Sequence, residues 1–414
     1  MTDIAGTVPV IAVDKVQAVA LAVCTYYFGV WLKGKVGVLS RYSIPSPVVG
    51  GMSFAIVVSF LEYFNIVKVQ IDSTLQTVLM LGFFTTIGLM ASLRVVKDGG
   101  RLLLGFLLAV TVLVFLQNGM GMAIAEAMGF DKHYGILAGS VSMMGGLGTA
   151  AAFGPYFEET YGITGGTAVA VTAATFGMVA ALLIGASRGG WCIRRYKVKT
   201  PDEVQQPEPE LHLPDDMDTD ITEQHASAKP NFTNEIMRAV SVTALAMGLG
   251  TIVSNFLGHY ITLPAYIGAM IVATVIRNVG DFSGMYKVEG KGLNAVADIT
   301  LVLFVTMAIN NLKLHELVHL ALPLVVILAC QTILMLIYAW TVLFTAFGRS
   351  YDAVMLSVGG IGFSMGATAN GLANMQAISE KYGSSPRAWL IVSVVGAFLI
   401  DLINAVVITW FGTL

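Results

Sequence analysis

Long apolar runs separated by short polar stretches dominate the pattern of hydrophobic and polar positions along the chain. A helix needs roughly 20 mostly apolar residues to cross the hydrocarbon core of a bilayer. The runs therefore predict ten membrane-spanning helices, at about 16–32, 46–64, 74–92, 102–126, 165–187, 236–256, 263–277, 294–312, 318–346 and 387–412.

Two further apolar segments, 134–158 and 351–379, are rich in glycine and small polar residues. Irregular backbone at membrane depth is tolerated only where protein surrounds it or where it lines a water-filled cavity. We therefore expect both segments to enter the membrane, break, and turn back without crossing. Where their tips meet, we expect a binding site in the middle of the membrane.

Between the two sets of spans lies one clearly polar stretch, residues 200–230. It contains five prolines and nine acidic residues, with no Lys or Arg between Lys199 and Lys229. High charge with few apolar residues cannot support a core. The sequence thus predicts a first half at 1–190, an acidic linker at 191–232 and a second half at 233–414. An acidic segment that binds a partner is the alternative interpretation of the linker.

The two halves repeat one another at a nearly constant offset. Four residues recur 219 positions later, namely Pro45 as Pro264, Gly129 as Gly348, Thr149 as Thr368 and Gly177 as Gly396. Phe84 and Thr86 recur 220 positions later as Phe304 and Thr306. A shared offset at several places indicates an internal repeat.

The distribution of positive charge predicts the orientation. If each half crosses five times and its glycine-rich segment does not cross, nineteen of the 23 Lys and Arg residues lie on one side. The positive-inside rule makes that side cytoplasmic. The other four are Lys15, Lys68, Lys132 and Lys313. We expect a cytoplasmic central loop and both termini on the periplasmic or extracellular side.

Five crossings are an odd number, so the second half enters the membrane upside down. The predicted fold class is an all-α polytopic membrane protein. It has two inverted-topology repeats of five transmembrane helices, each with a broken re-entrant glycine-rich hairpin. This is the plan of many secondary transporters.

Composition narrows the function further. Hydrophobic residues make up 56% of the 414 and charged residues 12%, against about 25% charged in soluble proteins. A soluble enzyme, a disordered chain and a nucleic-acid binder are thereby excluded, and the net charge of −3 indicates no partner. Cys24, Cys192 and Cys330 are scattered and imply no disulfide framework. Residues 185–189 match the GxSxG motif of hydrolases without its strand or a nearby His, so we expect no enzyme.

Acidic and amide groups inside the spans are candidate binding residues. Asp401 lies midway along the last span, with Asn404 on the same helix face. A carboxylate there is costly and indicates a functional site, for a cation or an ammonium group. The alternative is a structural hydrogen-bond partner for a broken helix. Asp298 lies nearer a span end, and Glu62 and Glu126 are more typical of solvated outer ends.

The glycine-rich segments supply small oxygen donors: Ser140, Ser142, Thr149, Ser364, Thr368, Asn370, Asn374 and Gln376. Half-helix N-termini attract anions, and hydroxyl and carbonyl oxygens suit a hard cation such as Na⁺. The alternative is that small residues only allow tight helix packing. Gln117, Asn118 and Gln331 lie in mid-span, where amides also link helices.

Several stretches together carry a family resemblance: YSIPSPVVGG (42–51), LMLGFFTTIGL (79–89), LQNGMG (116–121), GGLGTAAAF (145–153), ATFG (174–177), GFSMGATANGLANMQAISEKYG (362–383) and VGAFLIDLINAVVI (395–408). On these motifs the chain resembles the bacterial sodium/glutamate symporter family over nearly its whole length. The resemblance implies sodium-driven uptake of L-glutamate, or a related small carboxylate, across the bacterial inner membrane. It also implies a homodimer and elevator-like movement, with no nucleic-acid partner.

The resemblance also implies roles for individual residues. The expected substrate-binding residues are Gly146, Gly148, Thr149, Gly366, Thr368, Asn370 and Gln376. The expected Na⁺ ligands are Ser142, Ser364, Asn374, Asp401 and Asn404. The chain departs from the family pattern at Met144, Leu147, Ala150, Ala369 and Asn370, where a change of substrate would be found. A proton-coupled or uncoupled carrier is the second hypothesis, and a channel or membrane sensor the third.

Overall fold

The computed structural model describes residues 8–41, 44–94, 100–201, 232–257, 264–284, 286, 290–314 and 319–414. These residues are mostly helical, and they include eight helices that are long and apolar enough to cross a membrane. Most of the predicted acidic linker, residues 202–231, lies outside the described residues.

Each of the ten predicted spans is helical. Eight of them are the single helices α1 (Lys15–Lys35), α3 (Ser46–Tyr63), α4 (Thr74–Met90), α6 (Gly100–Ala127), α9 (Gly166–Tyr196), α10 (Phe232–Leu257), α11 (Ala265–Ser283) and α12 (Lys291–Asn310). The ninth is α13 (Ala321–Tyr338), which continues as a π-helical stretch, η4 (Ala339–Ala346). The tenth is α16 (Pro386–Val394), η5 (Val395–Leu399) and α17 (Ile400–Gly412). Helix α4, of 17 residues, and α11 are not among the eight long apolar helices.

Both glycine-rich segments are broken helices. The first comprises α7 (Lys132–Ile136), η1 (Leu137–Val141) and α8 (Gly146–Tyr161). The second comprises α14 (Tyr351–Ser364) and α15 (Thr368–Tyr382). In the second, α14 and α15 pack against each other, and a side chain at Gly362 would collide with the backbone of Gly371. The breaks therefore lie at 142–145 and 365–367.

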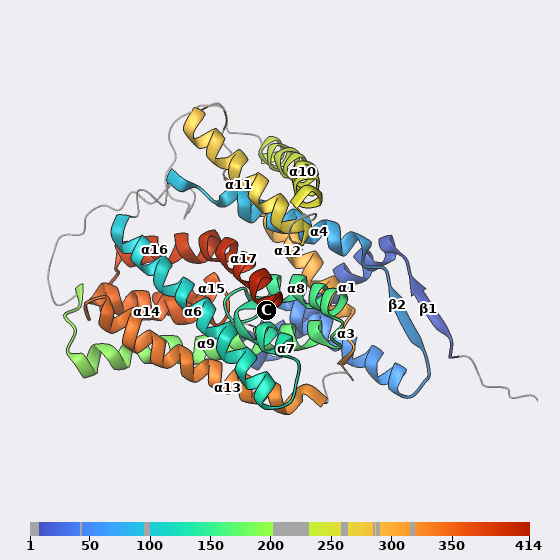
Figure 1. The fold of residues 1–414 in the computed structure, drawn as a ribbon, viewed down its shortest axis with the longest axis horizontal. Helices are drawn as coiled ribbons and strands as arrows, with labels where there is room; N and C mark the ends of the chain where they lie inside the picture. The colour runs from blue at the N-terminus through green and yellow to red at the C-terminus, as the bar shows by residue number, and fades with distance from the viewer. Residues whose placement is uncertain are drawn as a thin grey trace, which may run out of the picture.

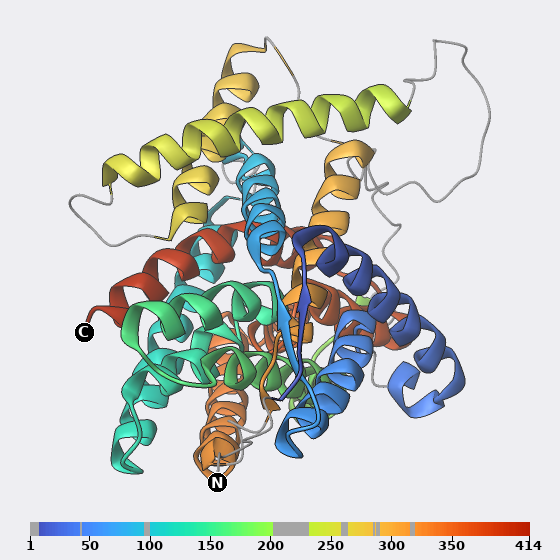
Figure 2. The same ribbon diagram turned by 90° about the vertical axis from the view of Figure 1, so that its right-hand side faces the viewer.

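The helices form two bundles (Figure 1). The first bundle contains α1, α3, α4, α10, α11 and α12, and the second contains α6 to α9 and α13 to α17. Within the first bundle, α10 runs across α4, α11 and α12 (Figure 2). The bundles touch where α12 packs on α8 and α9, where α4 packs on η5, and where α11 packs on α17.

Glycine allows a close approach of α1 and α3 in the first bundle. A Cβ atom at Gly50 of α3 would lie 1.8 Å from the carbonyl oxygen of Thr25 in α1. Small residues let helix backbones approach in a membrane, where there is little hydrophobic drive between helices.

A short parallel ribbon joins β1 (Val10–Val13) to β2 (Lys68–Ile71), with Val10 opposite Lys68. The sequence did not predict these strands, nor the short helix α2 (Gly37–Arg41). The all-α expectation therefore holds apart from this ribbon, which ties the start of the chain to the loop after α3.

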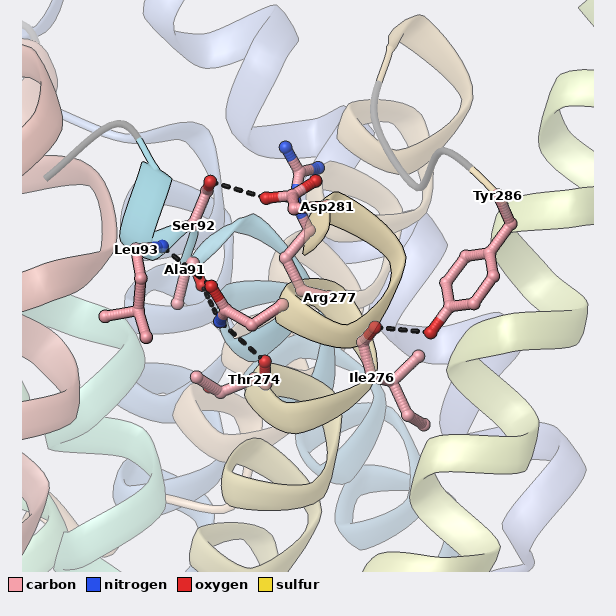
Figure 3. Close-up of polar contacts among 9 residues, drawn as sticks. Ala91, Ser92, Leu93, Thr274, Ile276, Arg277, Asp281 and Tyr286 are labelled. Atoms are coloured by element: carbon pink, nitrogen blue, oxygen red, sulfur yellow. Dashed lines mark hydrogen bonds and ion pairs between the residues drawn. The ribbon is translucent and has the colours of Figure 1, made fainter. Parts of the chain in front are cut away.

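The end of α4 is bound to α11 by a set of polar contacts (Figure 3). The Asn278 side chain accepts a hydrogen bond from the Leu93 N–H (2.8 Å) and donates to the Ala91 carbonyl (2.9 Å). Asp281 accepts from the Ser92 hydroxyl (2.5 Å) and pairs with Arg277 (3.0 Å). Because Arg277 and Asp281 are four residues apart on α11, they neutralise each other, and the helix continues past Arg277 to Ser283.

Candidate functional site

The tips of the two broken helices meet inside the protein. A Cβ atom at Gly146 would lie 2.5 Å from the carbonyl oxygen of Gly366, so the two backbones are in direct contact. Gly146 has φ = 62°, a left-handed conformation that side-chain-bearing residues rarely adopt. Glycine at Gly146 therefore satisfies both the backbone turn and the contact with the second tip.

Helix α9 and η5 hold the second tip in place. The Thr368 hydroxyl donates a short hydrogen bond to the carbonyl of Gly396. The side-chain amides of Asn370 and Asn374 donate to the carbonyls of Met178 (2.9 Å) and Ala181 (3.0 Å) in α9. Asn370 and Asn374 lie one helical turn apart on α15, so together they dock one face of this helix on α9.

The first tip is held by α9 as well, together with α6 and α17. The Ser142 hydroxyl lies 2.5 Å from the Leu137 carbonyl and 2.7 Å from the Ala170 carbonyl of α9. The Ser140 N–H donates to the Asn118 side chain (2.9 Å), and Asn404 donates to the Ser140 carbonyl (3.1 Å). These contacts satisfy backbone groups that the break around Gly139 removes from the helix ladder.

A cavity of about 480 Å³ lies beside the junction of the tips. Its walls come from both tips, from η5 and α17, and from α3, α4 and α12 of the first bundle. The cavity is thus between the two bundles. Its volume is in the range typical of small-molecule sites.

Two features set the electrostatics of this cavity. Among the described residues, those lining it that can ionise are Asp298 and Asp401, and none of the described Lys, Arg or His residues lines it. The first turns of α8 and α15 also line it, at Gly148 and Thr368. A helix N-terminus carries unpaired N–H groups and partial positive charge. The cavity can therefore receive carboxylate groups at the helix starts and a positive group near Asp401.

The Asp401 carboxylate is half-buried and makes no hydrogen bond or ion pair with the described residues. The alternative interpretation, a structural partner for a broken helix, therefore has no contact to support it. Asp298 also lines the cavity, on α12. Glu62 has a structural contact instead, since it accepts a hydrogen bond from the N–H of Val69 (3.2 Å).

The structure brings part of the predicted site together. Five of the twelve residues line the cavity: Gly146, Gly148, Thr149, Thr368 and Asp401. Gly366 contacts Gly146, while Asn370, Asn374, Ser142, Ser364 and Asn404 are buried beside the tips. Gln376 lies elsewhere: it is exposed on α15 and donates to Glu380 (3.0 Å), because it lies half a turn from the docked Asn374. Gln376 is therefore not part of the cavity wall.

The sequence did not identify the wall contributed by the first bundle. This wall includes Pro45, Phe83, Thr86, Leu301 and Val305. The internal repeat could have indicated this wall. Its matched stretches around Thr86 and Thr306 belong to α4 and α12, which are the helices that face the tips.

The side-chain amides in mid-span link helices, which is one of the two roles that the sequence suggested for them. Gln117 of α6 donates to the carbonyl of Ser364 (2.9 Å), and Gln331 of α13 donates to the carbonyl of Gln117 (2.7 Å). The GxSxG match is not a nucleophile elbow, since the Ser187 hydroxyl is bonded to Leu183 and Ile184 of its own helix.

No group of three or more His, Cys, Asp or Glu side chains in the described part of the chain is placed to hold a metal ion. Apart from the carboxylates of Asp298 and Asp401, the oxygens around the tips come from hydroxyls, amides and backbone carbonyls. Such neutral oxygens suit a weakly bound hard cation better than a transition metal.

Apolar helices, two of them broken at a shared internal cavity, define a polytopic membrane protein of the secondary-transporter class.

Comparison with known proteins gives the family. Residues 11–384 match the model of the sodium/glutamate symporter family. The chain is 37% identical over 400 residues to the sodium/glutamate symporter of Escherichia coli (strain K12), covering 95% of this chain and 96% of that protein. It is 34% identical over 395 residues to that of Haemophilus influenzae, covering 94% and 95%. The chain belongs to the sodium/glutamate symporter family, whose members are named as transporters and not as enzymes.

Proposed function

We propose that this protein is a sodium-coupled symporter that carries L-glutamate, or a related small carboxylate, into the cell. The observation that carries the proposal is the cavity at the junction of the tips, in a chain that matches curated sodium/glutamate symporters along nearly all of its length. The cavity would hold the substrate carboxylates at the starts of α8 and α15. Thr149 and Thr368 lie at these starts and line the cavity.

The charge of the cavity supports symport with a cation. Glutamate has a net negative charge, and no basic side chain from the described part of the chain lines the cavity to balance it. Helix N-termini supply only partial charges. A co-bound Na⁺ would supply a full charge, and Asp401 would pair with a positive group of the substrate or with a cation.

The order of elements supports two inverted repeats. In each half, three helices of the first bundle precede one long helix, a broken helix and a final long helix of the second bundle. The half-helix α14 has 14 residues, about 21 Å at 1.5 Å per residue, which is short of the roughly 30 Å hydrocarbon core. Its packing against α15 supports a re-entrant hairpin rather than a crossing.

Two bundles with the cavity between them support an elevator movement, in which the second bundle carries the tips past the first. The cavity is lined by Pro45 at the start of α3 and Met90 at the end of α4. The positive-inside distribution places these ends on the cytoplasmic side, so the proposal assigns this arrangement to the inward-facing state. The proposal includes a cytoplasmic central loop, both termini on the opposite side, and the homodimer that the family resemblance implies.

The experiment that tests the proposed function is substrate-dependent thermal stabilisation of the purified protein. A ligand that binds only the folded state raises the apparent melting temperature. L-glutamate should do so in sodium chloride and much less in potassium chloride. Equal stabilisation in both salts, or none in either, would contradict sodium-coupled glutamate binding.

A further inference from the structure

Six buried polar side chains form a cluster behind the tips, outside the cavity wall. They are Gln117 and Asn118 of α6, Ser140 of η1, Gln331 of α13, Ser364 of α14 and Asn404 of α17. Each has an exposed fraction of 1% or less. We call this set the polar cluster.

Hydrogen bonds connect the members of the polar cluster. Gln117 donates to the Ser364 carbonyl, and Gln331 donates to the Gln117 carbonyl. Asn118 accepts from the Ser140 N–H, and Asn404 donates to the Ser140 carbonyl. Because Gln117 and Asn118 are adjacent in the chain, the six side chains form one connected group that spans five helical elements.

The cluster is rich in oxygens that have no hydrogen-bond partner. Among the described residues these are the Gln117 and Gln331 Oε1 atoms, the Ser140 and Ser364 Oγ atoms and the Asn404 Oδ1 atom, against one unpartnered nitrogen, Asn118 Nδ2. The three amide oxygens can only accept a hydrogen bond, and the two hydroxyls can accept as well as donate. A buried polar atom without a partner is costly, and such atoms in native proteins call for an explanation. A connected, buried group with five oxygens able to accept and one amide nitrogen matches a cation better than an anion.

The backbone around the polar cluster also favours a cation. Helix α14 has 14 residues and ends at Ser364, so its C-terminal carbonyls and its partial negative charge lie at the cluster. The helix ladder is also broken at Gly139, next to Ser140. None of the six side chains carries a titratable group, so a proton cannot be the bound species on these side chains.

We propose that the polar cluster is a sodium site, separate from the cavity carboxylates and built from the side-chain oxygens of Gln117, Ser140, Gln331, Ser364 and Asn404. This inference rests on the proposed sodium-coupled function and names its ion site. Ser140 lies six residues before Gly146, and Ser364 lies two residues before Gly366. A cation bound to both serines would fix both tips together, and so pre-form the substrate site.

This arrangement gives a physical route for coupling. Sodium that orders the tips makes glutamate binding less costly, and glutamate must then raise sodium affinity by the same factor. The expected Na⁺ ligands Ser364 and Asn404 belong to the cluster. Ser142 does not, since its hydroxyl is bonded to the carbonyls of Leu137 and Ala170.

Two serine substitutions test the proposal. Ser140→Ala and Ser364→Ala each delete one unpartnered hydroxyl and leave the backbone hydrogen bonds in place, so both variants should fold. The matched control is Ser357→Ala, on α14 like Ser364, whose buried hydroxyl is already bonded to the Ala339 carbonyl (2.8 Å). The measurement is thermal stabilisation by sodium chloride without substrate, at constant ionic strength with choline chloride.

We expect Ser140→Ala and Ser364→Ala each to raise the sodium concentration for half-maximal stabilisation by roughly tenfold, since one ligand to a charged group is lost. Ser357→Ala should keep the wild-type concentration. If both test variants also keep the wild-type concentration while the wild type responds to sodium, the cluster is not the site, and the proposed function stands. If the wild type shows neither sodium stabilisation nor sodium-driven uptake, the proposed function itself fails.

Discussion

Gly146 lies with its backbone against the carbonyl oxygen of Gly366, and a methyl group on Gly146 would be 2.5 Å from that oxygen. The two residues belong to different halves of the chain, each at the tip of a broken helix. Their contact joins the two halves at the edge of the cavity. The proposed transport cycle depends on this contact, because it places the N-termini of α8 and α15 around the same space.

Gly146→Ala should abolish most transport. The left-handed backbone at this position costs a side-chain-bearing residue about 1–2 kcal/mol, and the added methyl group collides with Gly366. We expect uptake of L-glutamate to fall by roughly tenfold or more. The control is Gly119→Ala in α6, where nothing lies within 4 Å of the added atom. Wild-type uptake by Gly146→Ala would refute the close contact of the tips.

Thr368→Val should impair substrate binding, whereas Thr368→Ser should be tolerated. The valine keeps the shape but loses the hydrogen bond to the Gly396 carbonyl, which positions the start of α15 at the cavity. Loss of about 1–1.5 kcal/mol corresponds to roughly a tenfold lower kcat/KM. Initial uptake rates over a range of glutamate concentrations give kcat/KM for each variant. Equal values for the valine and serine variants would show that the hydroxyl plays no part.

Asp401→Asn separates sodium coupling from proton coupling. If Asp401 balances a positive group in the cavity, its neutral analogue should weaken glutamate binding or its sodium dependence by roughly tenfold. Uptake should then be measured against sodium at several pH values, with Asp298→Asn as the companion variant from the same cavity. A variant that keeps full sodium dependence and loses only its pH dependence would instead indicate a proton-coupled carrier.

Asn278→Ala should destabilise the protein without entering the transport site. The side chain makes three hydrogen bonds (Figure 3). Those with Leu93 and Ala91 bind the end of α4 to α11, and the third is to the Thr274 carbonyl of α11 itself. Leaving such buried groups unpaired costs about 1–3 kcal/mol each. The apparent melting temperature of the purified protein should fall by several degrees. Asn294→Ala, at an exposed position of α12, should leave it unchanged.

The sequence predicted the helices well because a long apolar run in a membrane protein has few alternatives to a helix. Helix ends were less predictable. Helix α11 continues past Arg277 because Asp281 pairs with it, and α9 continues through basic residues to Tyr196. The ribbon of β1 and β2 was not predicted, since each strand has four residues and its partner lies more than fifty residues away.

The site was predicted at the level of segments rather than side chains. The helices break within the glycine-rich stretches, and Gly146 and Thr368 line the cavity. The rotation of α15 about its axis was not readable from the sequence, so Gln376, now found on the exposed face, was indistinguishable from Asn374. The cavity wall from the first bundle depends on packing between distant segments, which a local pattern does not record.

Some of the residues that depart from the family pattern line the cavity, and others are buried behind its wall. Met144, Leu147 and Ala369 line the cavity, whereas Asn370 is buried and bonded to the Met178 carbonyl. Ala150 is fully buried. Differences in substrate preference from the relatives should therefore be sought at Met144, Leu147 and Ala369.

The most direct test of sodium-coupled symport is uptake of radiolabelled L-glutamate into proteoliposomes with an inward sodium gradient as the sole driving force. We predict accumulation above the external concentration, which collapses when a sodium ionophore dissipates the gradient. Uptake that only equilibrates glutamate, or that follows an imposed proton gradient regardless of sodium, would contradict the proposed coupling.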